Sequence, residues 1–162
     1  MFTKFLIREF TDKDSKSIFF LILDIVEKEF GIKVDLNGLD SDIVHLGGYY
    51  NQQNGGCLYV AEIEDSNKII GTAAIRNFKQ FHSACELKRM FVSKEYRKLG
   101  IGQRLLDITL DFARKAGYSK ILLYSSSALK AARNLYLKNG FVDTKRYNDD
   151  YRVDVFMQSP LW

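Results

Sequence analysis

A short loop of glycine and basic residues carries the clearest chemistry in this sequence. It reads Arg97-Lys98-Leu99-Gly100-Ile101-Gly102, between an apolar stretch that ends at Val92 and a helix predicted to begin near Ile101. Two glycines let consecutive backbone N–H groups converge, and the helix start adds the positive end of its dipole. Such a turn can bind a pyrophosphate, although glycines that only allow close helix packing are the plainer alternative. The spacing fits neither a Walker loop nor a dinucleotide fingerprint.

Basic residues are concentrated around this loop. The whole chain carries 24 Lys and Arg against 20 Asp and Glu, a net charge of +4. Residues 88–104 alone contribute +5, so the remainder is nearly neutral. A local cationic cluster attracts an anion of limited size, such as the phosphates of a nucleotide. A solvated basic surface is the alternative. Nucleic-acid binding is not favoured, because no recognition motif accompanies the basic residues.

Length and composition indicate one ordinary globular domain over residues 1–162. A hydrophobic share of 46% and a charged share of 27% exclude a disordered tail, a collagen-like repeat and a coiled-coil rod. Cys57 and Cys85 fit a reducing compartment and show no zinc-site spacing, so no metal is expected. The longest apolar runs are far shorter than the roughly 20 residues of a membrane helix, and the first residues lack a signal-peptide pattern. We therefore expect a cytoplasmic domain without a membrane partner.

The elements that position the loop follow from hydrophobic periodicity. Strands are predicted at 4–9, 57–64, 69–76, 84–92 and 120–124, and a last hairpin at 141–147 and 151–158. Helices are predicted at 11–31, 101–117 and 127–139, with a fourth at 40–50 that Gly47-Gly48 interrupts. This order indicates an α/β (α+β) fold, in which one mixed sheet of about seven strands carries four helices on its faces. The segment 84–124 should form a right-handed parallel crossover.

Two motifs in this order resemble the GCN5-related N-acetyltransferase (GNAT) superfamily. Within Glu86–Leu106, the residues Arg97, Gly100 and Gly102 match the family's pattern Arg/Gln-x-x-Gly-x-Gly/Ala. Downstream, the segment 132–141 is similar to the family's Ala-x-x-Leu-Tyr-x-x-x-Gly-Phe. The predicted order of elements also matches this fold from end to end.

Three residues depart from the family's pattern. Lys98 stands where many relatives have glycine, and Glu95 where proline is common. Both changes leave the loop plausible, because binding by backbone N–H groups does not need particular side chains. Leu129 replaces an asparagine near the cofactor in many relatives, which puts a side-chain contact from that position in doubt.

The resemblance implies an acetyl-CoA-dependent N-acetyltransferase that moves the acetyl group from the thioester directly to a primary amine. The acceptor would be a small molecule, with a protein amine as the alternative, and a homodimer is compatible with the family. A non-catalytic coenzyme A-binding module with the same fold is the competing interpretation. The main chain of the strand before the loop would hold the pantetheine arm, and the loop amides the pyrophosphate. The implied contacts with acetyl-CoA are Met90, Phe91, Val92, Arg97, Lys98, Leu99, Gly100, Ile101, Gly102, Gln103 and Asn134.

Tyr136 and Glu86 are the candidate catalytic residues. Tyr136 matches the family's tyrosine that faces the coenzyme sulfur, where a phenol can protonate or stabilise the departing thiolate. Glu86 matches a position where several relatives have a glutamate general base. Strand alternation groups Glu86 with Ala84, Lys88, Met90 and Val92, away from Cys85, Leu87, Arg89 and Phe91. The alternatives are a core tyrosine, a Glu86 ion pair that only anchors the strand, and a water chain as the base.

The acceptor amine is not specified by the sequence. In this family it would be framed by residues around 30–52 and 146–152. Aspartates beside aromatic residues there would suit a cationic amine, and a polar hairpin turn is the alternative. The residues concerned are Tyr49, Tyr50, Tyr147, Tyr151, Asp149 and Asp150.

Overall fold

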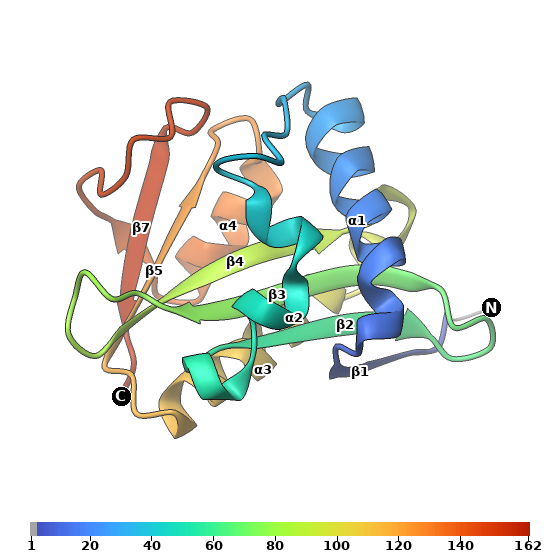
Figure 1. Ribbon diagram of the computed structural model, residues 1–162, viewed down its shortest axis with the longest axis horizontal. Helices are drawn as coiled ribbons and strands as arrows, with labels where there is room; N and C mark the ends of the chain where they lie inside the picture. The colour runs from blue at the N-terminus through green and yellow to red at the C-terminus, as the bar shows by residue number, and fades with distance from the viewer. Residues whose placement is uncertain (1–2) are drawn as a thin grey trace.

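The computed structural model describes residues 3–162 and shows one seven-stranded sheet with helices on both faces (Figure 1). The strands lie in the order β1-β2-β3-β4-β5-β7-β6. Every neighbouring pair is antiparallel except β4 and β5, which are parallel as predicted for a crossover. Their bounds are β1 Phe5–Glu9, β2 Cys57–Ile63, β3 Ile69–Asn77, β4 Ala84–Val92, β5 Lys120–Ser125, β6 Val142–Asp143 and β7 Val155–Pro160. The predicted mixed sheet is confirmed.

Four α-helices accompany the sheet, and all four are shorter than predicted, α3 by only two residues. They are α1 Ser15–Leu23, α2 Leu46–Tyr49, α3 Ile101–Lys115 and α4 Lys130–Lys138. The predicted helix at 11–31 continues beyond α1 as a π-helical turn, η2 Asp24–Glu29. The last helix begins three residues later than predicted, because the backbone and side chain of Ser127 bond instead to the Asp154 carboxylate.

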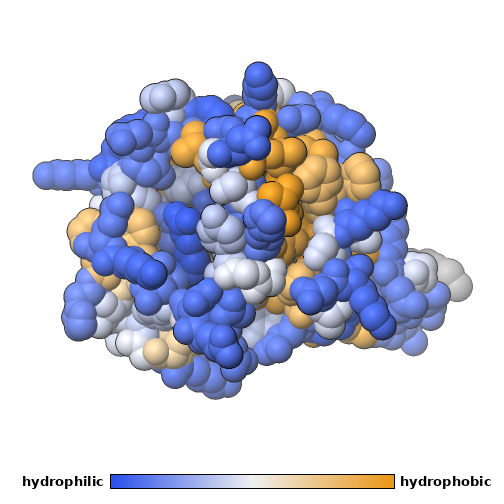
Figure 2. Space-filling view, viewed as in Figure 1, coloured by the Kyte–Doolittle hydropathy of each residue, from blue (hydrophilic) through white to orange (hydrophobic). Residues whose placement is uncertain are grey.

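The sheet separates two apolar cores. On one face, α3 and α4 pack against a large cluster that includes Leu105, Leu123 and Tyr136. On the other face, Ile18 and Ile22 of α1 pack with Val60 and Ala74 of β2 and β3. Apolar side chains also gather on the outer surface over α1 (Figure 2), where Phe20 is 52% exposed. No helix among residues 3–162 combines the length and apolarity that crossing a bilayer requires.

A bulge in β4 opens the sheet next to β5. The register between β3 and β4 shifts between Thr72 and Ala74, and Arg89 takes a left-handed φ of 51°. β4 and β5 pair only over the first three residues of β4, the last pair being Glu86 and Leu122. Beyond that point the two strands have no ladder between them, so the main chain of Met90–Val92 has no strand partner on its β5 side.

The same bulge corrects the predicted alternation of β4. Glu86 and Lys88 do lie opposite Cys85 and Leu87, as predicted. Beyond the bulge the grouping is wrong, because the extra residue at Arg89 reverses the alternation. Met90 and Val92 pack with the core that contains Cys85 and Leu87. Phe91 packs with the core under α1, and Arg89 turns toward the same face.

The last hairpin is shorter than predicted. Only Val142 and Asp143 of the first predicted strand pair with β7. The segment 144–154 is a loop, in which arginine side chains bond to several of the carbonyls that a strand would use in a ladder. Arg146 donates to the carbonyls of Asp150 and Val153, and Arg152 pairs with the Asp150 carboxylate.

Candidate active site

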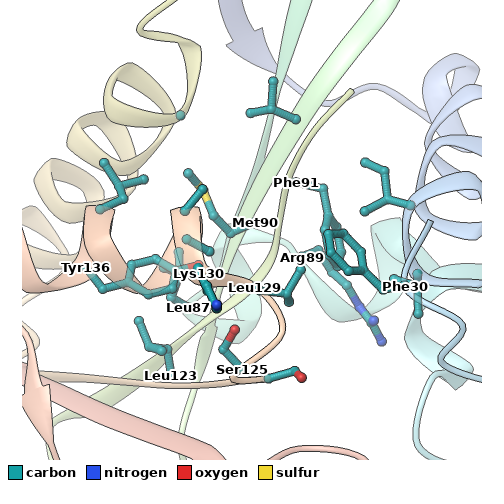
Figure 3. A pocket seen from close by; sticks show the side chains of 18 of the residues that line it. Phe30, Leu87, Arg89, Met90, Phe91, Leu123, Ser125, Leu129, Lys130 and Tyr136 are labelled. Atoms are coloured by element: carbon teal, nitrogen blue, oxygen red, sulfur yellow. The ribbon is translucent and has the colours of Figure 1, made fainter. Parts of the chain in front are cut away.

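A cleft of about 860 Å³ opens where β4 and β5 part. Its walls come from both faces of the sheet, with Tyr136 of α4 on one side and Arg152 of the 144–154 loop on the other. Figure 3 shows Tyr136 and Met90 at one side, and Arg89, Phe91 and Phe30 at the opposite side. A ligand in this cleft can therefore be reached from both faces of the sheet.

The structure brings nearly all the predicted cofactor contacts to this cleft. Leu99 does not line it and is 49% exposed. Asn134 does line it, from the exposed side of α4. The predicted contacts that line the cleft are Met90, Phe91, Val92, Arg97, Lys98, Gly100, Ile101, Gly102, Gln103 and Asn134. They come from the end of β4, the loop after it, and the first turns of α3 and α4.

The loop before α3 leaves a run of backbone N–H groups free. The first amide bonded back into the helix is that of Arg104, which donates to the Gly100 carbonyl at 3.1 Å. Among residues 3–162, no acceptor is found for the amides of 98–103. Gly100 has a φ of 80°, a left-handed conformation that glycine adopts without strain. A cradle of free amides at a helix start fits the pyrophosphate of coenzyme A.

Lys98 also takes a left-handed conformation, with a φ of 65°. A glycine would adopt this conformation without strain, which gives a physical reason for the glycine that the family often has there. The departure at Lys98 therefore keeps the shape of the loop and adds a positive charge to the cleft wall.

The Arg97 side chain holds the loop in place by bonding to Val92 and Glu29, and it makes no contact with the free backbone amides of the loop. Its Nε donates to the Val92 carbonyl at 2.9 Å, and its Nη2 donates to Glu29 Oε2 at 2.8 Å. A second contact joins Nη1 to the other oxygen of Glu29. The hydrogen bonds from Arg97 hold the pKa of Glu29 below its usual value. The ion pair ties the π-helical turn that follows α1 to the loop before α3.

Tyr136 faces the cleft from a buried position. It is 5% exposed, and its ring packs 5.7 Å from that of Phe141. Its hydroxyl has no hydrogen-bond partner among residues 3–162. Burial raises the pKa of Tyr136 well above its usual value, so the phenol keeps its proton at neutral pH. The side chain can therefore donate a proton or a hydrogen bond to a group in the cleft.

Glu86 is fully buried and does not line the cleft. Its Oε1 accepts a hydrogen bond from Arg76 Nε at 2.9 Å and forms an ion pair with Arg76 Nη2 at 2.8 Å. Its Oε2 has no hydrogen-bond partner among residues 3–162. Glu86 and Tyr136 are thus on different sides of β4, and only Tyr136 reaches the cavity directly.

Sequence reasoning missed Lys88 and Tyr124, which both line the cleft close to Glu86. Lys88 Nζ contacts the Tyr124 hydroxyl and lies 4.0 Å from Glu86 Oε1. The ammonium also lies 4.4 Å from the centroid of the Tyr124 ring. The available signal was a lysine inside a strand whose early residues are otherwise mostly apolar, on the same face as Glu86.

A network of buried ion pairs closes the other end of the cleft. Arg89 Nε donates to Asp42 Oδ2 at 2.8 Å, and its Nη2 donates to Asp40 Oδ1 at 3.0 Å. Arg152 Nη1 donates to Asp40 Oδ2 at 2.7 Å and to the Lys33 carbonyl at 2.8 Å. Burial alone would raise the pKa of Asp42, but the hydrogen bond and charge of Arg89 lower it below its usual value.

The structure separates the acidic and aromatic residues considered for the acceptor site. Asp150 is buried and paired with Arg152, so its charge is already balanced. The other aspartate considered, Asp149, is exposed, as are Tyr49 and Tyr151. Tyr50 is buried, with its hydroxyl bonded to Asp42, and Tyr147 packs against Phe78 and Phe156. Of these residues only Asp150 lines the cleft.

Comparison with known proteins agrees with this geometry. A family model described as an acetyltransferase (GNAT) domain matches residues 54–143, more than half of the chain. A protein named probable N-acetyltransferase camello from Xenopus tropicalis is 31% identical over 117 residues, which cover 69% of this chain and 52% of the relative. N-acetylaspartate synthetase from the same organism is 35% identical, over 67% of this chain and 41% of the relative. The chain thus spans about half the length of these relatives.

Solved structures of acetyltransferases have the same fold over nearly the full length of this chain. A GNAT-family acetyltransferase from Staphylococcus aureus superposes with a TM-score of 0.89 at 26% identity, covering 98% of this chain and 100% of that one. An acetyltransferase from Salmonella typhimurium, solved with its cofactor acetyl-CoA, gives a TM-score of 0.75 at 22% identity, covering 98% and 95%. These matches agree with the two sequence motifs and with the sheet that opens between β4 and β5. The chain belongs to the GNAT family of acetyltransferases.

Proposed function

We propose that this protein is an N-acetyltransferase that moves an acetyl group from acetyl-CoA to a primary amine. The observation that carries the proposal is the cleft itself, which crosses the sheet between a cradle of free amides and a set of polar side chains on the opposite face. A donor held from the side of α3 and α4 can therefore meet an acceptor that enters from the side of α1. Family membership supports the same reaction.

The residues around the loop before α3 would bind the donor. Its free amides suit the pyrophosphate, and Lys98 adds positive charge beside them. The main chain of Met90–Val92, free on its β5 side, suits the amides of a pantetheine arm, as an added strand would. Asn134 of α4 lines the same end of the cleft.

Acetyl-CoA supplies an acetyl group on a thioester, whose carbon–sulfur bond breaks as the carbon–nitrogen bond to the amine forms. A protonated amine loses two protons overall, and one proton ends on the departing sulfur. We assign the proton for the sulfur to Tyr136, whose buried hydroxyl keeps its proton and faces the cleft. Glu86 would act on the amine only through another group, because Glu86 does not reach the cleft.

The acceptor is proposed to be a small molecule. Two segments, 30–52 and 146–152, would frame the acceptor. Arg152 joins them by donating to the Lys33 carbonyl and to Asp40, and it thereby narrows that end of the cleft. A relative named N-acetylaspartate synthetase supports a small amino-acid acceptor. A protein amine is the alternative. The cytoplasmic location and the homodimer stay predictions.

Release of free thiol from acetyl-CoA, measured with a panel of primary amines, tests this function. We expect steady release that depends on at least one amine in the panel. Tight binding of acetyl-CoA in calorimetry without release with any amine would instead support the non-catalytic coenzyme A-binding module. No binding at all would contradict both.

A further inference from the structure

The first turn of α4 is a helix start without a side-chain cap, and it borders the cleft. Leu129 stands at the N-cap and has no side-chain oxygen, and the first turn contains no acidic residue. The first amide bonded back is that of Arg133, which donates to the Leu129 carbonyl at 3.1 Å. Among residues 3–162, no acceptor is found for the amides of 130–132. Free amides at the positive end of a helix dipole favour a negatively charged group.

A buried hydroxyl points into the cleft beside this helix start. Ser125, the last residue of β5, lines the cleft and is 8% exposed. Its hydroxyl has no hydrogen-bond partner in the part of the chain that the structure describes. Because Ile121 and Leu123 belong to the apolar core that contains Tyr136 of α4, strand alternation places Ser125 on the same side. Figure 3 shows its oxygen directed into the cleft. Buried hydroxyls are normally paired, so this one indicates an atom of a ligand.

Lys130 adds a positive charge to the same place. It is exposed, it lines the cleft, and it forms no ion pair or hydrogen bond with residues 3–162. In Figure 3 its nitrogen lies in the open part of the cleft, between Tyr136 and Arg89. The two carboxylates that line the cleft, Asp40 and Asp150, are both paired with arginines. An anion in the cleft therefore meets an unpaired cation, whereas a cation meets no unpaired carboxylate among the described lining residues.

The two ends of α4 lie at opposite ends of the cleft. At its last turn, the side chains of Asn139 and Gln103 exchange hydrogen bonds of 2.8 and 3.0 Å, which ties α4 to the donor loop at α3. At its start, the Ser127 amide donates to Asp154 Oδ1 at 2.8 Å, which ties α4 to the 144–154 loop. Asp154 does not line the cleft, so its charge stays outside. A helix of nine residues separates these ends by roughly 12 Å. The start of α4 is therefore at the acceptor end.

We propose that the start of α4 binds a carboxylate of the acceptor, through Lys130 Nζ, the Ser125 hydroxyl and the free amides of 130–132. The proposal rests on the proposed acetyl transfer and names the class of its acceptor, an amine that also carries a carboxylate, such as a free amino acid. Lys130 supplies the charge, and the hydroxyl and the amides supply directed hydrogen bonds. An amine without a carboxylate would leave these donors without an acceptor.

The test is kcat/KM for a panel of free amino acids, each measured beside its own carboxamide, with acetyl-CoA as the donor. Each variant is compared with the wild type on the same compound, which removes the difference in basicity between the two amines. Lys130→Met should lower kcat/KM for the amino acid about ten- to a hundredfold, and Ser125→Ala about tenfold, as expected for hydrogen bonds to a charged group. The value for the carboxamide should change little. Binding of acetyl-CoA in calorimetry should be unchanged.

Lys145→Met is the matched control, since Lys145 is an exposed lysine of the 144–154 loop that does not line the cleft. This variant loses the same charge and should keep both wild-type values. Equal losses for the amino acid and its carboxamide in Lys130→Met overturn the inference. Weaker binding of acetyl-CoA in Lys130→Met also overturns it, because Lys130 would then hold the donor.

A carboxylate on the acyl group is the other source of an anion, and succinyl-CoA compared with butyryl-CoA tests it. If Lys130→Met lowers the use of succinyl-CoA alone and leaves the amino acids unchanged, the carboxylate belongs to the donor and the inference is wrong. A wild type that acetylates carboxamides or alkylamines but no amino acid overturns the inference and leaves the proposed function standing. A wild type that binds acetyl-CoA and acetylates none of these compounds overturns both.

Discussion

Among single residues, Tyr136 is the one whose effect on chemistry separates most cleanly from its effect on binding. Its ring packs in the core beside Phe141, its hydroxyl has no hydrogen-bond partner among the residues that the structure describes, and the side chain lines the cleft. Because burial keeps the phenol protonated, the hydroxyl can act on a thiolate only as a donor. A group that acts on the leaving sulfur matters mainly in the transition state.

Tyr136→Phe should therefore lower kcat by about a hundredfold with KM nearly constant, as measured by steady-state thiol release. The variant keeps the ring, so folding should be unaffected. Raising the pH should give no rescue, because a higher pH does not supply the missing proton. Wild-type turnover in Tyr136→Phe would make this residue a core tyrosine only.

Gly102 tests whether the loop before α3 is the binding site for the donor. A methyl group built there lies 3.5 Å from Leu135, 3.8 Å from Met90 and 3.9 Å from Val92, which are ordinary contacts. Gly102→Ala should therefore fold normally, yet weaken acetyl-CoA binding in calorimetry by about tenfold or more, since a side chain obstructs close approach to the amides. Gly48→Ala is the control, because a Cβ at Gly48 meets nothing within 4 Å. Undiminished affinity in Gly102→Ala would remove the loop from the site.

At the scale of elements, the sequence predicted those features that are determined by residues close together along the chain. The glycine loop, the sequence of strands and helices along the chain and the parallel crossover follow from local patterns, and the structure agrees with them. The bulge at Arg89 could not be predicted in this way, since it depends on the register between β3 and β4. The ion pair of Arg89 with Asp42 was equally hidden, because 47 residues separate its partners.

This ion pair fixes the segment before α2 against the bulge of β4. Asp42→Ala leaves Arg89 with Asp40 alone in a site where Arg89 is 8% exposed. We expect the free energy of unfolding to fall by about 3–5 kcal/mol, measured by urea denaturation. Tyr50→Phe, which removes one hydrogen bond to the same carboxylate, should cost only about 1–3 kcal/mol. If both variants lowered the free energy of unfolding by the same amount, the charge of Asp42 would have no role in stabilising this segment.

The same carboxylates make stability sensitive to acid. The pKa values of Asp40 and Asp42 are lowered below their usual range, in spite of burial, by hydrogen bonds and charges from arginines. Their contribution to stability is complete above the unfolded pKa of about 4, and is lost as the pH falls below it. Thermal unfolding followed between pH 7 and pH 3 should show a steeper loss below about pH 4 in the wild type than in Asp42→Ala.

At the scale of the whole molecule, the cleft divides the sheet into two parts joined by few strand pairs. β4 and β5 share only three paired positions. Arg152 of the loop before β7 pairs with Asp40 of the segment before α2, which adds a side-chain bridge across the opening. A ligand that fills the cleft contacts both parts at once, so its binding energy adds to the stability of the whole domain.

Coenzyme A should therefore raise the melting temperature of the entire domain in one transition. A ligand at a hundred times its dissociation constant adds about 2.7 kcal/mol, which corresponds to a shift of roughly 5–11 °C for a domain of this size. Differential scanning fluorimetry measures the shift. Tyr136→Phe should show all of it, because its missing hydroxyl acts on chemistry and not on holding the ligand. Gly102→Ala should show much less at the same concentration. An equal shift in Gly102→Ala would mean that coenzyme A binds away from the loop, and a second, unshifted transition would mean that the cleft does not join the two parts of the sheet.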